Sequence, residues 1–239
     1  MSKLLAAVLI LITPAVRASF AQAPQALHAP DGGTRETLTS IVVPPLPNAP
    51  FSATVETEWT KYLADGSTQV TRNHRLIARD GLGRVFQERR TFVPKTSPID
   101  STVWRIDLAE PSTHTVAYCD TRGRTCELRP YVAPAATAPP IGAPASLGSQ
   151  ILNGLELIGT RETQTLRWST DSSSRPLVVV KEFWYSKQLG LNVLTTRDDP
   201  RSGKEVFTVK DIRQGEPDAA LFALPADFRV VDLRAALAR

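Results

Sequence analysis

Few side chains in this sequence can act as nucleophiles, metal ligands or proton carriers near neutral pH. The 239 residues include two cysteines, Cys119 and Cys126, and three histidines, His28, His74 and His114. A zinc site needs three or four ligands at close spacings, and the sequence offers no such group. The G-x-S-x-G pattern that exposes a nucleophilic serine is also absent. We therefore predict no metal, no cofactor and no catalytic residues, so the protein is not expected to be an enzyme.

The two cysteines are the one pair whose spacing predicts a covalent bond. Six residues separate Cys119 from Cys126, around a turn at residues 121–124. If Arg122 and Gly123 form a two-residue loop, the two thiols face each other across a hairpin. In an oxidising compartment a disulfide is favoured, and closing this short loop contributes about 2–3 kcal/mol. Free thiols are one alternative, and a redox pair, which normally needs C-x-x-C spacing, is another.

Aromatic side chains are the other group with a functional interpretation. Trp59, Trp104, Phe183, Trp184 and Tyr185 all fall within strand-like runs. Such residues can fill a core, which is their usual role. They can also line an apolar cavity inside a curved sheet, where barrels often hold a ligand. We take these five as candidate ligand-binding residues.

Acidic residues give weaker indications. Glu156, Glu162 and Glu182 could pair for acid–base work, but any large sheet contains such residues. Asp198 and Asp199 precede a Pro-Arg-Ser-Gly turn, and adjacent acids do not match the alternating oxygen ligands of a calcium loop. We interpret them as part of a solvated turn.

The N-terminal segment predicts export. Lys3 precedes an uninterrupted apolar run at residues 4–12, and Ser19 and Ala21 form a small–x–small cleavage site. The apolar run is half the length that a membrane anchor requires, and Pro14 follows it. We expect a signal peptide at residues 1–21 and a periplasmic or secreted protein that is soluble after cleavage and has no transmembrane anchor.

Charge argues against nucleic acid as a partner. Removing residues 1–21 takes away Lys3 and Arg17 and lowers the formal net charge from +4 to +2. The densest positive clusters, at residues 89–90 and 122–124, are short. Nucleic-acid binding would require a basic stripe, so none is predicted.

Alternating side chains indicate strands over most of the chain. A Pro- and Ala-rich leader is expected at residues 22–50, followed by a single antiparallel β domain at residues 51–232. The domain contains a loop at residues 132–146, and a tail at residues 233–239 follows it. Short helical turns are expected at residues 147–152 and 218–222, and in the tail. Ten strand-like runs are expected, one starting at residue 51 and the others at about residues 69–79, 84–93, 102–108, 113–119, 124–131, 154–168, 177–187, 191–197 and 204–213.

This pattern predicts an all-β, mainly antiparallel fold. Ten strands in one sheet require strong curling. We expect a single large curved sheet that forms a half-closed barrel, with one or two short helices. A two-sheet sandwich is the alternative.

Several segments resemble an uncharacterised family of exported bacterial proteins. The resemblance covers about residues 50–231 and implies no activity and no catalytic residue. Its most specific pieces are Glu182-Phe183-Trp184-Tyr185-Ser186 and Gly215-Glu216-Pro217-Asp218-Ala219-Ala220-Leu221-Phe222 with Pro225. The strand order and the late Leu-Phe…Pro-x-x-Phe segment are similar to lipoprotein carriers of the LolA/LolB type and to the N-terminal domain of the sigma-regulator RseB. That similarity implies a LolA-like half-barrel with an apolar concavity covered by helices.

Taken together, these patterns predict a non-enzymatic envelope protein. We expect a lipid, an acylated ligand or another apolar ligand in the concavity of the sheet, with a lipid, a lipoprotein or another envelope protein as partner. The alternative is a structural or sensory module that recognises protein segments through strand edges or through the loop at residues 132–146.

Overall fold

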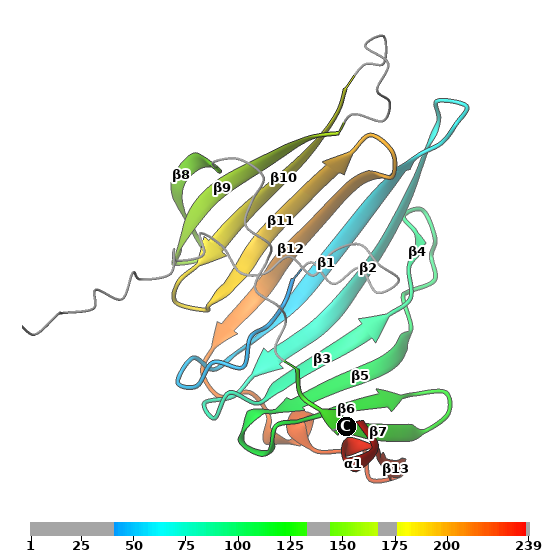
Figure 1. The fold of residues 1–239 in the computed structure, drawn as a ribbon, viewed down its shortest axis with the longest axis vertical. Helices are drawn as coiled ribbons and strands as arrows, with labels where there is room; N and C mark the ends of the chain where they lie inside the picture. The colour runs from blue at the N-terminus through cyan, green and yellow to red at the C-terminus, as the bar shows by residue number, and fades with distance from the viewer. Residues whose placement is uncertain (1–40, 133–143, 167–175, 238–239) are drawn as a thin grey trace, which may run out of the picture.

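The chain forms one twisted, curved sheet in a computed structural model that describes residues 41–132, 144–166 and 176–237 (Figure 1). The expected signal peptide, most of the leader and most of the loop at residues 132–146 lie outside the described residues. Within the described part of the chain, no helix has the length and apolar character needed to cross a membrane.

Strands make up nearly all of the regular structure. The first half contains β1 (Phe51–Tyr62), β2 (Thr68–Arg79), β3 (Val85–Arg90), β4 (Val93–Pro94), β5 (Val103–Glu110), β6 (Thr115–Asp120) and β7 (Thr125–Pro130). The second half contains β8 (Ala145–Leu152), β9 (Leu155–Leu166), β10 (Leu177–Ser186), β11 (Leu191–Asp199), β12 (Gly203–Gln214) and β13 (Arg229–Asp232). The helices are short: η1 (Pro111–Thr113), η2 (Ala219–Phe222) and α1 (Arg234–Leu237).

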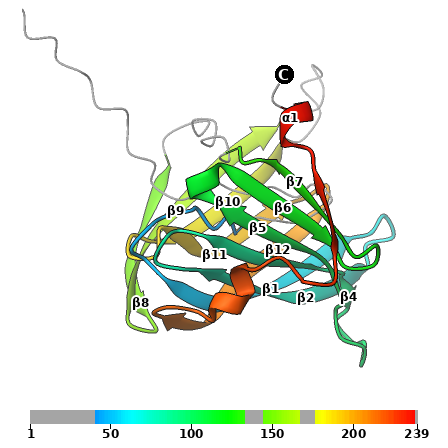
Figure 2. The same ribbon diagram turned by 90° about the horizontal axis from the view of Figure 1, so that it is seen from below.

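The strand order is β13-β7-β6-β5-β3-β2-β1-β12-β11-β10-β9-β8, with β4 paired to β2. All pairs are antiparallel except β13 with β7, which run parallel at one edge (Figure 2). Because β8 and β13 are the two ends of this order and do not pair, the sheet curls without closing. The expectation of a single curved sheet that forms a half-closed barrel is confirmed, and the two-sheet alternative is wrong.

Three strands were not anticipated, and one expected helix is absent. The predicted helical turn at residues 147–152 is wrong, because this segment belongs to β8 and pairs with β9. Gly148 lies there at φ +83°, a conformation incompatible with a right-handed helix, and it coincides with a register shift in the pairing. β4 and β13 are only two and four residues long, too short for a periodic pattern.

The two faces of the sheet carry separate apolar clusters, as period-two alternation requires. On the concave face, one parity of β1 and β2, including Phe51, Val55 and Ile77, packs with Val209 of β12. On the convex face, the opposite parity packs around Leu108 and is covered by η2 and the segment after it.

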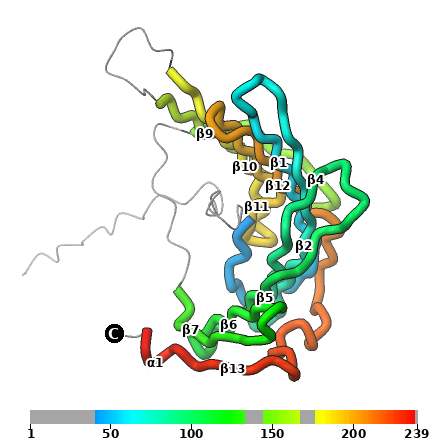
Figure 3. The backbone as a smooth tube through the Cα atoms, turned by 90° about the vertical axis from the view of Figure 1, so that its right-hand side faces the viewer, coloured from blue at the N-terminus to red at the C-terminus, as the bar shows by residue number. Residues whose placement is uncertain are grey.

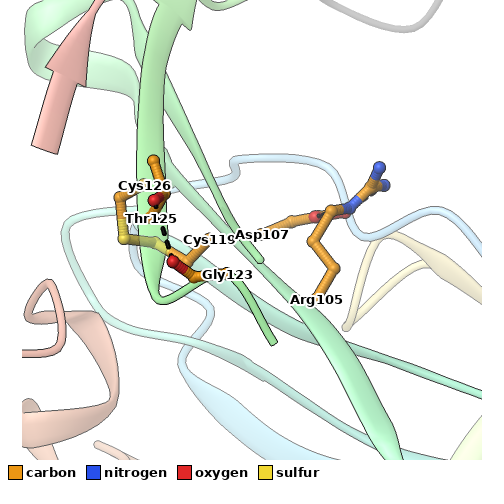
Figure 4. Close-up of a disulfide and its surroundings, with 6 residues drawn as sticks. All are labelled: Arg105, Asp107, Cys119, Gly123, Thr125 and Cys126. Carbon is orange, nitrogen blue, oxygen red and sulfur yellow. Dashed lines mark hydrogen bonds and ion pairs between the residues drawn. A yellow bond between two sulfur atoms is a disulfide. The ribbon is translucent and has the colours of Figure 1, made fainter. Parts of the chain in front are cut away.

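A disulfide joins β6 to β7 within the convex cluster. Cys119 and Cys126 are direct cross-strand partners with a Cα–Cα distance of 3.9 Å, and both are fully buried. Figure 4 shows the disulfide directed to one side of the strands, while Arg105 and Asp107 of β5 point to the other. The bond therefore fixes the β6–β7 hairpin, which lies next to the parallel edge strand β13 in the sheet.

Replacing both cysteines by alanine should lower the free energy of unfolding by about 2–3 kcal/mol, because the unfolded chain regains the entropy of the opened loop. Chemical denaturation of the wild type and of the Cys119→Ala/Cys126→Ala variant measures this. Reductant should destabilise the wild type by a similar amount and leave the variant unchanged. Equal stability of the two proteins without reductant would contradict the prediction.

Candidate functional site

The concave face is covered by a segment that belongs to no strand. We call residues 41–50 the strap. Figure 3 shows it within the curvature of the sheet. Its sequence contains four prolines, which lack the N–H group that strand pairing requires, so its carbonyl oxygens need other donors. Ile41 is fully buried and Val43 nearly so, and both belong to the concave apolar cluster.

Arg79, at the end of β2, supplies most of these donors. Its Nε and Nη2 atoms donate to the Ala49 carbonyl oxygen at 2.9 and 2.8 Å. Nη1 donates to the Pro44 carbonyl oxygen at 3.0 Å, and Nη2 also donates to the Leu189 carbonyl oxygen at 2.7 Å. The guanidinium lies 5.0 Å from the ring centre of Phe51. One buried side chain thus connects β2, the strap and the β10–β11 turn.

Arg75 holds the other end of the strap. It lies four residues before Arg79 in β2 and on the same face of the sheet. Its Nη2 atom donates to the Ile41 carbonyl oxygen at 2.8 Å, and Nη1 donates to Gln87 Oε1 at 3.0 Å. Burial lowers the pKa of Arg75 well below its ordinary value, to about 9, and the positive charge of Arg89 acts in the same direction. Burial likewise lowers the pKa of Arg79 to about 10. Both guanidiniums are therefore held in an environment that disfavours their charge.

The turn between β2 and β3 also supports the strap. The Asn48 N–H donates to the Gly81 carbonyl oxygen at 3.0 Å. Gly83 adopts φ +84°, and a Cβ atom there would lie 3.2 Å from the Pro47 nitrogen. Glycine at this position therefore permits both the turn and the close approach of the strap.

Beyond Arg75, charged side chains cross the same face from β3 to β5. Asp107 is nearly buried and accepts from Arg89 Nε and from Arg105 Nε, each at 2.7 Å. The Arg105 guanidinium lies 4.9 Å from the ring centre of Tyr118 on β6. We call Arg75, Arg89, Arg105 and Asp107 the charged band. Arg105, at one end of the band, also lines a cleft of about 430 Å³ over β5, β6 and β7.

The five predicted aromatic residues are not gathered in one place. Trp59 and Trp184 both pack against the concave apolar cluster, from β1 and β10. Phe183 is fully buried and faces Thr160 and Thr195 in the neighbouring strands, and Tyr185 follows a register shift in β10. Trp104 lies on β5, with the Arg105 guanidinium 4.9 Å from its ring centre. Ligand binding by these residues stays a prediction.

Trp184 explains a glycine on the neighbouring strand. A Cβ atom at Gly159 would lie 2.8 Å from both Trp184 Cζ3 and Leu147 Cβ, so β8, β9 and β10 can pack here only around a residue without a side chain.

The convex face contains a larger hollow, of about 790 Å³, over β1, β2 and β12. Its charged residues bind one another across neighbouring segments: Glu58 with Lys95 at 2.7 Å and Glu56 with Lys210 at 2.5 Å. His74 Nδ1 lies 3.4 Å from Asp100 Oδ1. These exposed pairs contribute little to stability, and they make the lining of the hollow mostly polar.

Two of the acids that the sequence analysis considered form local ion pairs. Glu182 accepts from Arg161 at 2.6 Å, and Asp199 accepts from Arg201 at the same distance. Among the residues that the structure describes, no three His, Cys, Asp or Glu side chains gather closely enough to hold a metal ion.

The position of Arg75 and Arg79 in the sequence indicates that they are buried, although the sequence analysis did not select them. Arg75 and Arg79 flank the buried Ile77 on the inward parity of β2. Charged residues on an inward parity must find partners when buried, so their position indicated a polar contact inside the concavity. The identity of that contact, a backbone segment about 30 residues earlier, required the fold.

Comparisons with known proteins identify no family for this chain. No family model and no curated protein matches it. Among solved structures it is similar to a conserved uncharacterised protein from Thermus thermophilus, with 13% identity, coverage of 77% of this chain and 91% of that chain, and a TM-score of 0.41. LprF from Mycobacterium bovis is 12% identical, with coverage of 74% of this chain and 89% of that chain and a TM-score of 0.31. A LolA superfamily protein from Nitrosomonas europaea is 11% identical, with coverage of 74% of this chain and 91% of that chain and a TM-score of 0.30. These TM-scores are below 0.5, so the fold rests on the strand order and register of this chain itself.

Replacing Arg79 by methionine should release the strap. The carbonyl oxygens of Pro44, Ala49 and Leu189 would lose their donor, and we expect a loss of about 2–4 kcal/mol in unfolding free energy after allowing for the buried charge that is removed. Arg72→Met is the matched control, because Arg72 is exposed and lies on the opposite face of the same strand. Hydrogen exchange should increase at residues 41–50 in the Arg79 variant and not in the control. Unchanged protection of the strap in both proteins would contradict the role of Arg79.

Asp199 should contribute to the acid sensitivity of the fold. Hydrogen bonds from the Arg201 side chain are the main cause that lowers the pKa of Asp199 below 3.8. A lowered pKa means that this carboxylate stabilises the folded state above about pH 4 and that the contribution is lost as the pH falls through the folded value. Asp199→Asn should therefore be less stable than the wild type at pH 7, and the difference should shrink below pH 4. Thermal unfolding from pH 2 to pH 7 measures this. A difference that does not vary with pH would contradict it.

Proposed function

We propose that the protein is an exported, non-enzymatic binding protein of the cell envelope that holds the apolar chain of a lipid or acylated molecule on the concave face of its sheet. In the absence of ligand, the strap occupies that surface. The supporting observation is that Ile41 and Val43, from a segment outside every strand, bury the apolar floor that Val55, Ile77 and Val209 provide.

The strap is suited to displacement. It shares no strand pairing with the sheet, and its described hydrogen bonds come from two arginines, from the turn between β2 and β3 and, at its last residue Pro50, from the Gly215 N–H. Burying Ile41 and Val43 contributes about 3–6 kcal/mol, an amount that a long acyl chain can match at about 0.8 kcal/mol for each buried methylene. Exchange of one apolar occupant for another is therefore energetically feasible.

The strap and the ligand should compete. Ile41→Ser/Val43→Ser weakens the internal occupant, so the binding-competent state becomes more populated and the apparent affinity for an apolar probe should rise about tenfold or more. Titration of delipidated protein with N-phenyl-1-naphthylamine, followed by fluorescence, measures this. Ile99→Ser, at a position that is 71% exposed, is the matched control and should bind as the wild type does.

Two results would count against the proposal. Absence of probe binding in both the wild type and the strap variant, with both proteins folded, would exclude an apolar site. Equal affinity in the two proteins would show that the strap does not occupy the site. Acyl species found by native mass spectrometry of protein purified without detergent would support the proposal.

The alternative, a protein-interaction module, is favoured by β8. This edge strand of eight residues contains no charged residue and no proline, and Ile151 in it is 80% exposed. Edges of sheets usually carry such features to prevent pairing with other chains. An empty core in native mass spectrometry, together with the absence of probe binding, would favour this second function.

A further inference from the structure

We infer that the ligand is an anionic amphiphile, whose carboxylate or phosphate binds Arg75 and Arg89 while its chain takes the place of Ile41 and Val43. This inference rests on the proposed function and specifies its ligand class. The juxtaposition that carries it is a displaceable apolar occupant directly beside a buried group of arginines.

The Ile41 carbonyl oxygen marks the position of the headgroup. It is a neutral acceptor at 2.8 Å from Arg75 Nη2, at the point where the apolar floor meets the charged band. An anionic oxygen at the same position would form a charge-assisted hydrogen bond, which is about twice as strong as a neutral one. The strap therefore gives this guanidinium an acceptor but no counter-charge.

Positive charge exceeds negative charge in the band. Arg75, Arg89 and Arg105 share one carboxylate, Asp107, which both Arg89 and Arg105 contact. Three other acids lie near the band and have partners of their own: Asp120 accepts from the Gly123 N–H, Glu127 pairs with Arg129, and Glu88, on the opposite parity of β3, pairs with Arg90 at 2.9 Å. Buried charges in proteins are normally paired, so the arrangement is complete only with a further anion. Burial is the main cause that lowers the pKa of Arg75, and the positive charge of Arg89 adds to it.

Two N–H donors without hydrogen-bond partners also lie in the charged band. Arg75 Nε and Arg89 Nη1 are buried and have no hydrogen-bond partner among the residues that the structure describes. Arg75 is 3% exposed, and the Arg89 side chain is 12% exposed, so solvent reaches neither well. Leaving such donors unsatisfied is costly, and a headgroup with two or three oxygens could accept from both.

A headgroup series with one chain length tests this inference. Dodecanoate, dodecyl phosphate and dodecan-1-ol are titrated below their aggregation concentrations into delipidated full-length protein, with displacement of N-phenyl-1-naphthylamine as the readout. We expect at least one anion to bind the wild type about ten- to a hundredfold more tightly than the alcohol. The tighter of the two anions distinguishes a free fatty acid from a phosphorylated lipid as the source.

Two variants locate the preference. Arg75→Met should reduce the advantage of the anion over the alcohol to less than about threefold while retaining alcohol binding. Arg72→Met, three residues earlier on the opposite face, should keep the wild-type ratio. If Arg75→Met does not fold, Arg89→Gln provides the same comparison at a less buried position.

The outcomes separate this inference from the proposed function. If the alcohol binds the wild type as tightly as both anions, the anionic headgroup is overturned and the apolar site stands. If the anions are preferred but neither arginine variant changes the ratio, the assignment to Arg75 and Arg89 is overturned. If no amphiphile binds, the proposed function itself fails.

Discussion

The concave side of this protein depends on two buried guanidiniums that bind backbone carbonyls. Arg75 and Arg79 leave β2 on the same face and hold residues 41–50 against the sheet. A proline-rich segment cannot be held by strand pairing, because it lacks the required N–H groups. An arginine side chain, with five donors and a long apolar stem, can satisfy several carbonyls and remain packed among apolar residues.

An open curved sheet creates the need for this arrangement. A closed barrel buries its inner face by closure, whereas a sheet that ends at β8 and β13 leaves its apolar inner face without a covering layer. The convex cluster is covered by η2 and is fixed at one end by the disulfide, a covalent bond. The concave cluster is covered by a segment held at a few points. The two faces thus differ in how readily they can be uncovered, and this difference makes the concave face the candidate binding surface.

Much of the fold followed from local patterns. Alternation from Phe51 onward and the turns at residues 65–66 and 80–83 located the first hairpins, and the facing of Cys119 and Cys126 followed from the spacing of one turn. β8 was missed because an exposed edge strand has no buried parity and therefore shows no alternation. β13 was missed because its four residues are ordered by parallel pairing with β7, a partner about a hundred residues away.

The sequence by itself determined the class of fold, because period-two alternation and turn residues act over a few neighbouring positions. It also determined that reactive side chains are scarce. Only the tertiary structure decided what the concavity contains. The pairing of β2 with β3 and of β3 with β5 brings Arg75 and Asp107 onto one face, and the strap adds Ile41 to them. No local pattern encodes such a contact, since the partner of a buried charge is set by the path of the whole sheet and not by its sequence neighbours.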